Sequence, residues 1–412
     1  MRKRIHILVA ALAVLPLVGC DDLVDVVNPD VVDAGSIDPN ADQATFALSA
    51  LQDFYDVYTD AIVYQAWFTN EARVGDTFPT RNEFGRRIVS DANGTMSGEV
   101  FNPLAASIAT TADATDLLGG VSDAATNINL LRVNFASGFA RLVMAETFCQ
   151  SVIRLSAPMT ASQMLDSAIV AFDRAISIGT ANGSATATSL ANAARVGKAR
   201  ALLAQGNASE AASIASAVPA DFVFNVDYAD IAGNRGRLGN DVFSFSAGGA
   251  RESLVVGPEW RAFADMGDPR IAYVDAGRLA QDGELQMFSQ RKYPGYDADV
   301  PLASGLQARY IAAEANGTAA QLALLNERRL ANGHTAFASA DPGAILDEFL
   351  LQKGLDLWLT GSRMNDIFRH GDNVPFVIPP GNNYYKPQLG EVSTQTCIPV
   401  PNDEKDNNPN WT

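Results

Sequence analysis

Apolar residues recur every three or four positions along much of this chain, which is the spacing of one face of an α-helix. The clearest stripe contains Ile128, Leu131, Phe135, Phe139 and Leu142. The same spacing begins near Asp42 and returns over residues 103–118, 165–176, 188–205, 209–217, 307–330 and 343–368. This pattern predicts a mainly α fold.

Four consecutive helices between residues 127 and 218 have short connections and many Ala and Gly residues. Small residues let neighbouring helices approach closely, and each hairpin buries its apolar face on the next, so the pattern favours helix-hairpin repeats. Residues 200–211 also align weakly with 309–320, since both contain a helix end followed by an Asn turn. Two unrelated helix–turn–helix units would also explain this similarity. We expect repeats over about 127–218 and 307–369.

Two long segments lack helical spacing. Residues 75–102 contain many Pro, Gly, Asn and Arg, which predicts an irregular segment. Residues 221–306 are often interrupted by Gly and Pro, and brief alternation at 222–226 and 242–246 predicts two short strands. Long ordered insertions usually carry binding surfaces. We therefore predict a loop-rich lobe with a few short strands beside the helical repeats, within a single domain over 42–412.

The beginning of the chain has the pattern of an export signal. Three basic residues at positions 2–4 precede an apolar run over 5–18, which leads into a Leu-Val-Gly-Cys sequence ending at Cys20. The run is too short to span a bilayer, and a small residue before a cysteine is typical of a lipoprotein cleavage site. We predict a lipoprotein signal peptide over 1–19, acylation of Cys20 and a flexible tether over 20–41. An ordinary cleaved signal is the alternative.

Charge and cysteine content narrow the partners. The chain has 47 acidic and 30 basic residues and a net charge of −17. Such a surface repels phosphates, so we expect no nucleic-acid partner, and attachment to a membrane only through the N-terminal lipid.

Two cysteines, Cys149 and Cys397, remain after Cys20. In an exported protein they predict one disulfide, and two separate buried thiols are the alternative.

The sequence offers few candidates for catalysis. Beyond the export signal the histidines are His334 and His370, each in a turn sequence. We find no nucleophile elbow, no paired-histidine metal motif, no phosphate-binding loop and no dinucleotide fingerprint. We therefore expect a protein that is not an enzyme and has no catalytic residue, metal or cofactor. A glycan-processing enzyme whose carboxylates meet only in space is an alternative.

Aromatic residues in the irregular segments are candidates for ligand binding. Flat exposed rings with Asn, Asp and Arg nearby suit the stacking of sugar rings and hydrogen bonding to hydroxyl groups. The candidate ligand-binding residues are Trp67, Arg81, Asn82, Phe84, Tyr293 and Tyr296. The alternative is that these rings pin the loops onto the helical core.

The C-terminal third carries a recognisable motif. Gly361, Arg363, Asp366 and Arg369 have the spacing of a late helix in the SusD/RagB family of nutrient-binding outer-membrane lipoproteins, which this segment resembles. Four positions of that helix differ from the family pattern: Gln352, Lys353, Asp356 and Thr360. The closing sequences Cys397-Ile398-Pro399-Val400-Pro401 and Asn408-Pro409-Asn410 are also similar to family elements. Because Arg363 and Asp366 stand one helical turn apart, they can pair or reach neighbouring backbone, so we interpret the motif as structural.

The resemblance implies a fold of tetratricopeptide-type helix hairpins with a loop-rich lobe. It also implies an outer-membrane lipoprotein, facing the cell surface, that sits as a lid on a SusC-like TonB-dependent β-barrel transporter. Such a lid captures an oligosaccharide or peptide ligand and delivers it inward without chemistry. A tetratricopeptide-type envelope scaffold that binds protein segments is the alternative function.

Overall fold

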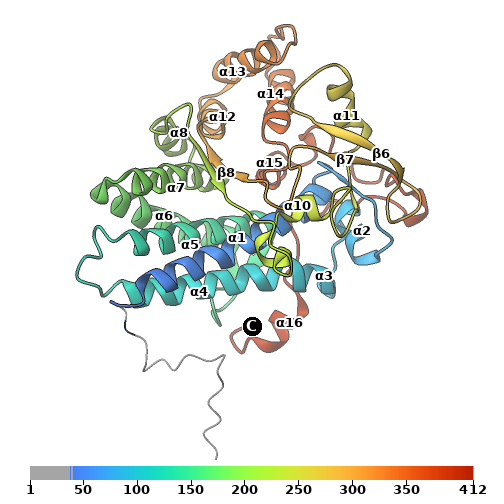
Figure 1. Cartoon of the computed structure of the whole chain (residues 1–412). Coiled ribbons are helices and arrows are strands. Elements are labelled where there is room, and N and C mark those ends of the chain that lie inside the picture. Colours follow the sequence, from blue (N-terminus) through green and yellow to red (C-terminus); the bar gives the residue numbers. More distant parts are fainter. Residues whose placement is uncertain (1–37, 39, 412) are drawn as a thin grey trace, which may run out of the picture.

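The computed structural model describes Asp38 and residues 40–411 (Figure 1). The signal peptide expected over 1–19, the acylated Cys20 and most of the tether expected over 20–41 lie outside the described residues. The described chain is mainly α-helical, as the apolar spacing predicts, with four small two-stranded sheets. In this described part, no helix combines the length and apolar character that crossing a bilayer demands.

The helix α1 (Gln43–Phe68) is at the centre of the fold. It packs against α4 (Asn102–Leu118) and α5 (Ile128–Thr147), which lie beside it in Figure 1. From Val57 to Phe68 every residue except Asp60 is buried, because other elements cover this half of α1 on nearly all sides. The main hydrophobic core therefore surrounds α1.

Helix α5 begins a series of helix hairpins. The helices that follow it in this series are α6 (Ala161–Asn182), α7 (Ala185–Ala204) and α8 (Ala208–Ser216). Local signals set the ends: Thr160 and Gln163 form a capping box, and Gly183 ends α6 with a φ of +69°. Gly138 and Gly197 both face the Phe172 ring, and a Cβ on either would overlap it. Small residues thus allow the close helix packing that the composition predicts.

A second set of helices continues the array. Its members are α12 (Gly305–Ala315), α13 (Thr318–Ala331) and α14 (Pro342–Asp356). Helix α12 packs on α8, although about 90 residues separate the two helices in sequence. They meet because β4 (Val223–Val226) pairs antiparallel with β8 (Val300–Ser304), so the insertion starts and ends at the same place.

The insertion, which runs from β4 to β8, forms the lobe beside the helical hairpins. Its helices are α9 (Arg235–Leu238), α10 (Asp241–Ser244) and α11 (Pro258–Asp265). Its strands are β5 (Leu254–Val255), which pairs with β1 (Arg73–Val74), and the antiparallel pair β6 (Tyr273–Leu279) and β7 (Gln286–Gln290). The strand expected over 222–226 is confirmed as β4. The strand expected over 242–246 is wrong: the Asn240 side chain accepts a hydrogen bond from Phe243 N at 3.2 Å and starts α10 instead.

The segment expected to be irregular over 75–102 contains short helices. They are α2 (Pro79–Arg86), α3 (Gly94–Met96) and the π-helical turn η3 (Ser97–Phe101). Pro79 stands at the first position of α2, where a missing N–H costs no helical hydrogen bond. Asn93 caps α3 by accepting from Met96 N at 2.9 Å. Pro79 and Asn93, which predicted an irregular segment, therefore begin helices.

The late helix expected over 343–368 is broken into α14 and α15 (Arg363–His370). Between them Leu359 and Gly361 have φ values of +54° and +69°, which a helix does not contain. A Cβ on Gly361 would lie 3.1 Å from Ile62 of α1. The chain therefore turns sharply here because it passes against the central helix.

The tail returns to α5. Cys149 and Cys397 form a disulfide, and Cys149 N donates to Ile398 O at 2.9 Å. Asn408 Nδ2 donates to Ser156 O at 2.9 Å. The other tail elements are η4 (Gly371–Asn373), η5 (Pro387–Leu389) and α16 (Asn402–Asn407), and β2 (Gln150–Ser151) pairs with β3 (Met159–Thr160) next to the disulfide.

Candidate functional site

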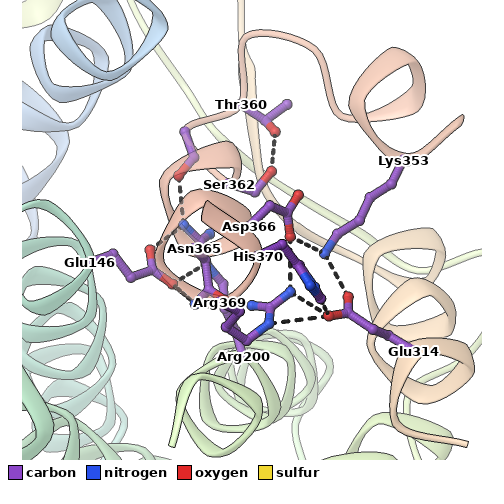
Figure 2. Close-up of polar contacts among 11 residues, drawn as sticks. Glu146, Arg200, Glu314, Lys353, Thr360, Ser362, Asn365, Asp366, Arg369 and His370 are labelled. Carbon is purple, nitrogen blue, oxygen red and sulfur yellow. Dashed lines mark hydrogen bonds and ion pairs between the residues drawn. The ribbon is translucent and has the colours of Figure 1, made fainter. Parts of the chain in front are cut away.

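A network of buried ion pairs surrounds α15 (Figure 2). Glu314 of α12 is its centre: its carboxylate accepts from Lys353 at 3.1 Å, from Arg369 at 2.7 Å and from the His370 ring at 2.9 Å. Asp366 bonds Lys353 at 2.6 Å and Arg369 at 2.9 Å. The four charged side chains other than His370 are at most 11% exposed. These contacts join α12, α14 and α15.

A second buried pair joins α15 to the first hairpins. Arg200 of α7 donates to Glu146 of α5 at 2.6 Å and to the carbonyl of Gly361 at 2.6 Å. Asn365 donates to the same carboxylate at 2.5 Å (Figure 2). The hollow beside these residues measures about 10 Å³, which is room for at most one water molecule. The geometry therefore suits a structural joint and leaves no room for a ligand.

The motif that resembles the SusD/RagB family lies in this joint. Gly361 makes the turn, and Asp366 and Arg369 belong to the network. Arg363 does not pair with Asp366; it donates to the carbonyl of Pro375 and lies 5.1 Å from the Trp260 ring centre. Burial lowers the pKa of Arg363. The sequence allowed Arg363 either to pair with Asp366 or to reach neighbouring backbone, and the structure shows the backbone contact.

The structure buries the rings that we expected to be exposed for ligand stacking. Trp67, Phe84 and Tyr293 are at most 2% exposed, and Tyr296 is 8% exposed. The expectation of an exposed platform is wrong for these four residues, because each ring gains more from packing in the core than from facing water. Trp67 and Phe84 belong to helices α1 and α2, whereas Tyr293 holds its loop to the core by donating to Leu359 O at 2.9 Å, as in the alternative.

The polar candidates have separate surroundings. The Asn82 side chain is buried and donates to Asp76 O at 2.8 Å, so it serves the local turn. The Arg81 side chain is 11% exposed, and its guanidinium is paired with Asp76 at 2.5 Å. Arg81 is the least buried of the six candidates.

Arg81 belongs to a group of side chains that we call the Phe78 cluster, made of Phe78, Arg81, Glu99, Phe245 and Arg251. Phe78 is 56% exposed, and the Arg81 guanidinium lies 4.9 Å from its ring centre and 5.1 Å from that of Phe245. Arg251 lies 4.8 Å from the Phe245 ring centre and bonds Glu99 at 2.7 Å. The buried rings of Tyr64 and Trp67 pack beneath Phe245. The cluster thus presents one ring, two cations and a carboxylate on an aromatic base.

Buried carboxylates lie under this cluster. Burial and the neighbouring Asp241 raise the pKa of Asp60 well above its usual range, and one of its oxygens is buried with no hydrogen-bond partner among the described residues. Burial raises the pKa of Asp241 to about 7, against the lowering effect of Arg251. Asp60 and Asp241 therefore hold protons at or near neutral pH, which limits the negative charge next to Glu99.

Replacing Asp241 with Asn should change how stability depends on pH. An unfolded Asp titrates near 3.9, below the folded value of about 7. Stability is therefore lost as the pH rises between these values. We expect Asp241→Asn to have the same free energy of unfolding as the native protein at pH 4. At pH 8 its free energy of unfolding should be higher by on the order of 2 kcal/mol, because the neighbouring Asp60 takes up part of the cost of burying negative charge. Urea unfolding at both pH values measures this. An equal difference at the two pH values would contradict it.

Sequence reasoning did not find Glu99, Phe245 or Arg251 as site residues. Glu99 and Arg251 are 152 residues apart, and neither lies in a motif. Phe245 was part of an expected strand, whereas it follows α10 and turns inward. No local pattern carries this information, because the cluster forms only when the insertion packs against α1 and η3.

The fold is that of SusD-like proteins. A laminarin-binding SusD-like protein matches with a TM-score of 0.67 and 14% identity, over 87% of this chain and 96% of that chain. Surface glycan-binding protein A from Bacteroides thetaiotaomicron, in complex with laminarihexaose, matches with a TM-score of 0.66 and 13% identity, over 88% and 97%. A SusD/RagB family protein from Bacteroides thetaiotaomicron matches with a TM-score of 0.62 and 14% identity, over 91% and 95%.

These likenesses confirm the resemblance to SusD/RagB proteins at the level of the fold. No protein-family model and no curated protein matches the sequence. At 13–14% identity, what the similar proteins bind is a property of those proteins.

Proposed function

We propose that this protein is a surface lipoprotein that binds oligosaccharides and delivers them to a SusC-like TonB-dependent transporter of the outer membrane. The observation that carries the proposal is the likeness, over nearly the whole chain, to one protein that binds laminarin and another solved with laminarihexaose. The acylation of Cys20 and the outer-membrane location belong to this proposal and rest on the sequence alone.

The Phe78 cluster supplies suitable chemistry for sugar recognition. The half-exposed Phe78 ring offers a flat apolar face, and Arg81, Arg251 and Glu99 offer donors and acceptors for hydroxyl groups. Asp76 and Glu99 already hold the two guanidinium groups in place. Binding therefore orders few side chains, which reduces its entropic cost.

Replacing Phe78 with Ala should weaken oligosaccharide binding about tenfold, which corresponds to about 1.4 kcal/mol. The loss follows from removal of the one exposed ring of the cluster. Titration calorimetry with laminarihexaose first, and then with other neutral oligosaccharides, measures the affinity.

The matched control is Phe368→Ala, because Phe368 of α15 is also a surface ring, 44% exposed, outside the cluster. That variant should bind as the native protein does. If no oligosaccharide binds, the envelope scaffold becomes the better account, since a scaffold for protein segments ignores sugars. Cleavage of the probe during the titration would contradict a non-enzymatic role.

Delivery to a transporter has its own test. Mild detergent extraction of the full-length protein from its native membrane should bring down a large β-barrel protein. Recovery of the protein alone under several mild conditions would count against the partnership while leaving sugar binding untouched.

A further inference from the structure

A groove with three arginines lies on the helical hairpins, and no residue of the Phe78 cluster lines it. Helix α5 forms its base between α4 and α6. The groove consists of two adjoining hollows of about 150 and 460 Å³ that share Thr115, Asp116, Asn134 and Arg174. This space is large enough for a molecule of the size of a sugar unit.

Arg141 of α5 is the unusual residue of this groove. It is 7% exposed, and its Nε is buried with no hydrogen-bond partner among the described residues. Its guanidinium forms no ion pair within the described chain either, yet it lines the smaller hollow. A buried charge without a partner is strongly unfavourable, so folded proteins seldom contain one.

Two further arginines increase the positive charge. Arg154 and Arg174 also line the smaller hollow. Burial lowers the pKa of Arg141 to about 10, and repulsion from these two residues adds to the shift. Arg154 is paired with Asp113 at 2.5 Å and Asp116 at 2.8 Å, whereas Arg174 forms no ion pair with a described residue. Arg141 and Arg174 thus have no ion-pair partner among the described residues, and the Asp116 carboxylate that lines both hollows is paired with Arg154.

The remaining lining is suited to a polar organic molecule. Asn134, Ser137 and Arg141 lie on one face of α5, and Ser167 and Arg174 face them from α6. Leu130 and Ile178 add apolar surface in the larger hollow. The groove therefore combines unpaired cations, hydroxyl groups and an apolar wall.

We propose that this groove is an oxyanion site, which binds the carboxylate, sulfate or phosphate group of a small organic ligand between Arg141 and Arg174. The anion supplies the hydrogen-bond acceptors that Arg141 lacks, and the guanidinium fork matches its planar or tetrahedral oxygens. The body of the ligand lies in the larger hollow. This site is independent of the proposed glycan binding at the Phe78 cluster.

The test compares glucuronate, glucose 6-phosphate and glucose by titration calorimetry at constant ionic strength. We expect one or both anions to bind and glucose not to bind at this groove. Binding of glucuronate alone identifies a carboxylate site, and binding of glucose 6-phosphate identifies the site as one for tetrahedral anions. Absence of binding by both anions at concentrations up to 100-fold above the protein overturns the proposal.

The variant Arg141→Met should weaken anion binding at least tenfold. Arg132→Met is the matched control: Arg132 is on the same helix, carries the same charge and donates to Asn129 at 3.0 Å outside the groove. Thermal unfolding without ligand provides a second measurement, because Arg141→Met removes an unpaired buried charge and should melt at the same temperature or higher. Equal loss of binding in both variants, or a marked drop in melting temperature for Arg141→Met alone, would show a bulk charge effect or a structural role and overturn the proposal.

Discussion

Replacing Glu314 with Gln should lower the free energy of unfolding by about 3–5 kcal/mol, the usual cost of breaking a buried ion pair. Glu314 is 7% exposed and is the acceptor for Lys353, Arg369 and His370. Gln keeps the shape but leaves the buried Lys353 and Arg369 with Asp366 as the remaining carboxylate partner among the described residues. Urea unfolding at pH 7 measures the loss.

The matched control is Glu327→Gln on the adjacent α13. Glu327 pairs with Arg309, but these side chains are 50% and 38% exposed, so the loss should be below about 1 kcal/mol. Similar losses in the two variants would show that the joint around α15 contributes little.

The effect of Glu314→Gln should also depend on pH. Burial by itself would raise the pKa of Glu314, but Lys353, Arg369 and His370 outweigh it and hold the pKa well below its usual range. An unfolded Glu titrates near 4.3. The stabilisation is thus fully present above that value and is lost as the pH falls below it. The difference between native protein and variant should shrink below about pH 4, and a constant difference down to pH 2 would contradict the ion-pair explanation.

Opening the Cys149–Cys397 disulfide should destabilise the protein by about 5 kcal/mol in the chain-entropy description, because the bridge closes a loop across 248 positions. Cys149 is exposed and Cys397 is half-buried, so a reductant can reach the bond in the folded protein. Thermal unfolding with and without reductant measures the effect. We expect a clearly lower melting temperature in reductant.

The double variant Cys149→Ser, Cys397→Ser is the control for this prediction. It should melt at the temperature of the reduced protein and should not respond to reductant. In the oxidised protein the disulfide and the hydrogen bond from Asn408 to Ser156 O hold the tail to the segment that follows α5. After reduction of the disulfide, limited proteolysis should therefore first cut the tail near α16. An unchanged melting temperature in reductant would show that the other tail contacts are sufficient.

The helices of the repeats could be predicted because their signals are local. The stripe from Ile128 to Leu142 needs one buried face, and Asn127 caps its helix by accepting from Leu130 N at 3.0 Å. The strand expected over 242–246 did not form because its local signal was ambiguous. Val242 and Phe245 are both buried, a spacing that suits one helical turn, while alternation alone favoured a strand.

The sequence by itself determined the helical hairpins, the acidic charge and the family motif, since each depends on neighbours in the chain or on simple counts. The tertiary structure alone decided which rings are exposed, how α14 separates from α15, and which charges meet. Trp67 and Phe78 are both aromatic residues near irregular segments, yet one is buried and the other is at the surface. Glu99 meets Arg251, and Arg141 has no hydrogen-bond partner for its Nε among residues 40–411, only because distant segments pack together. Such contacts depend on long-range packing, which no local pattern of residues encodes.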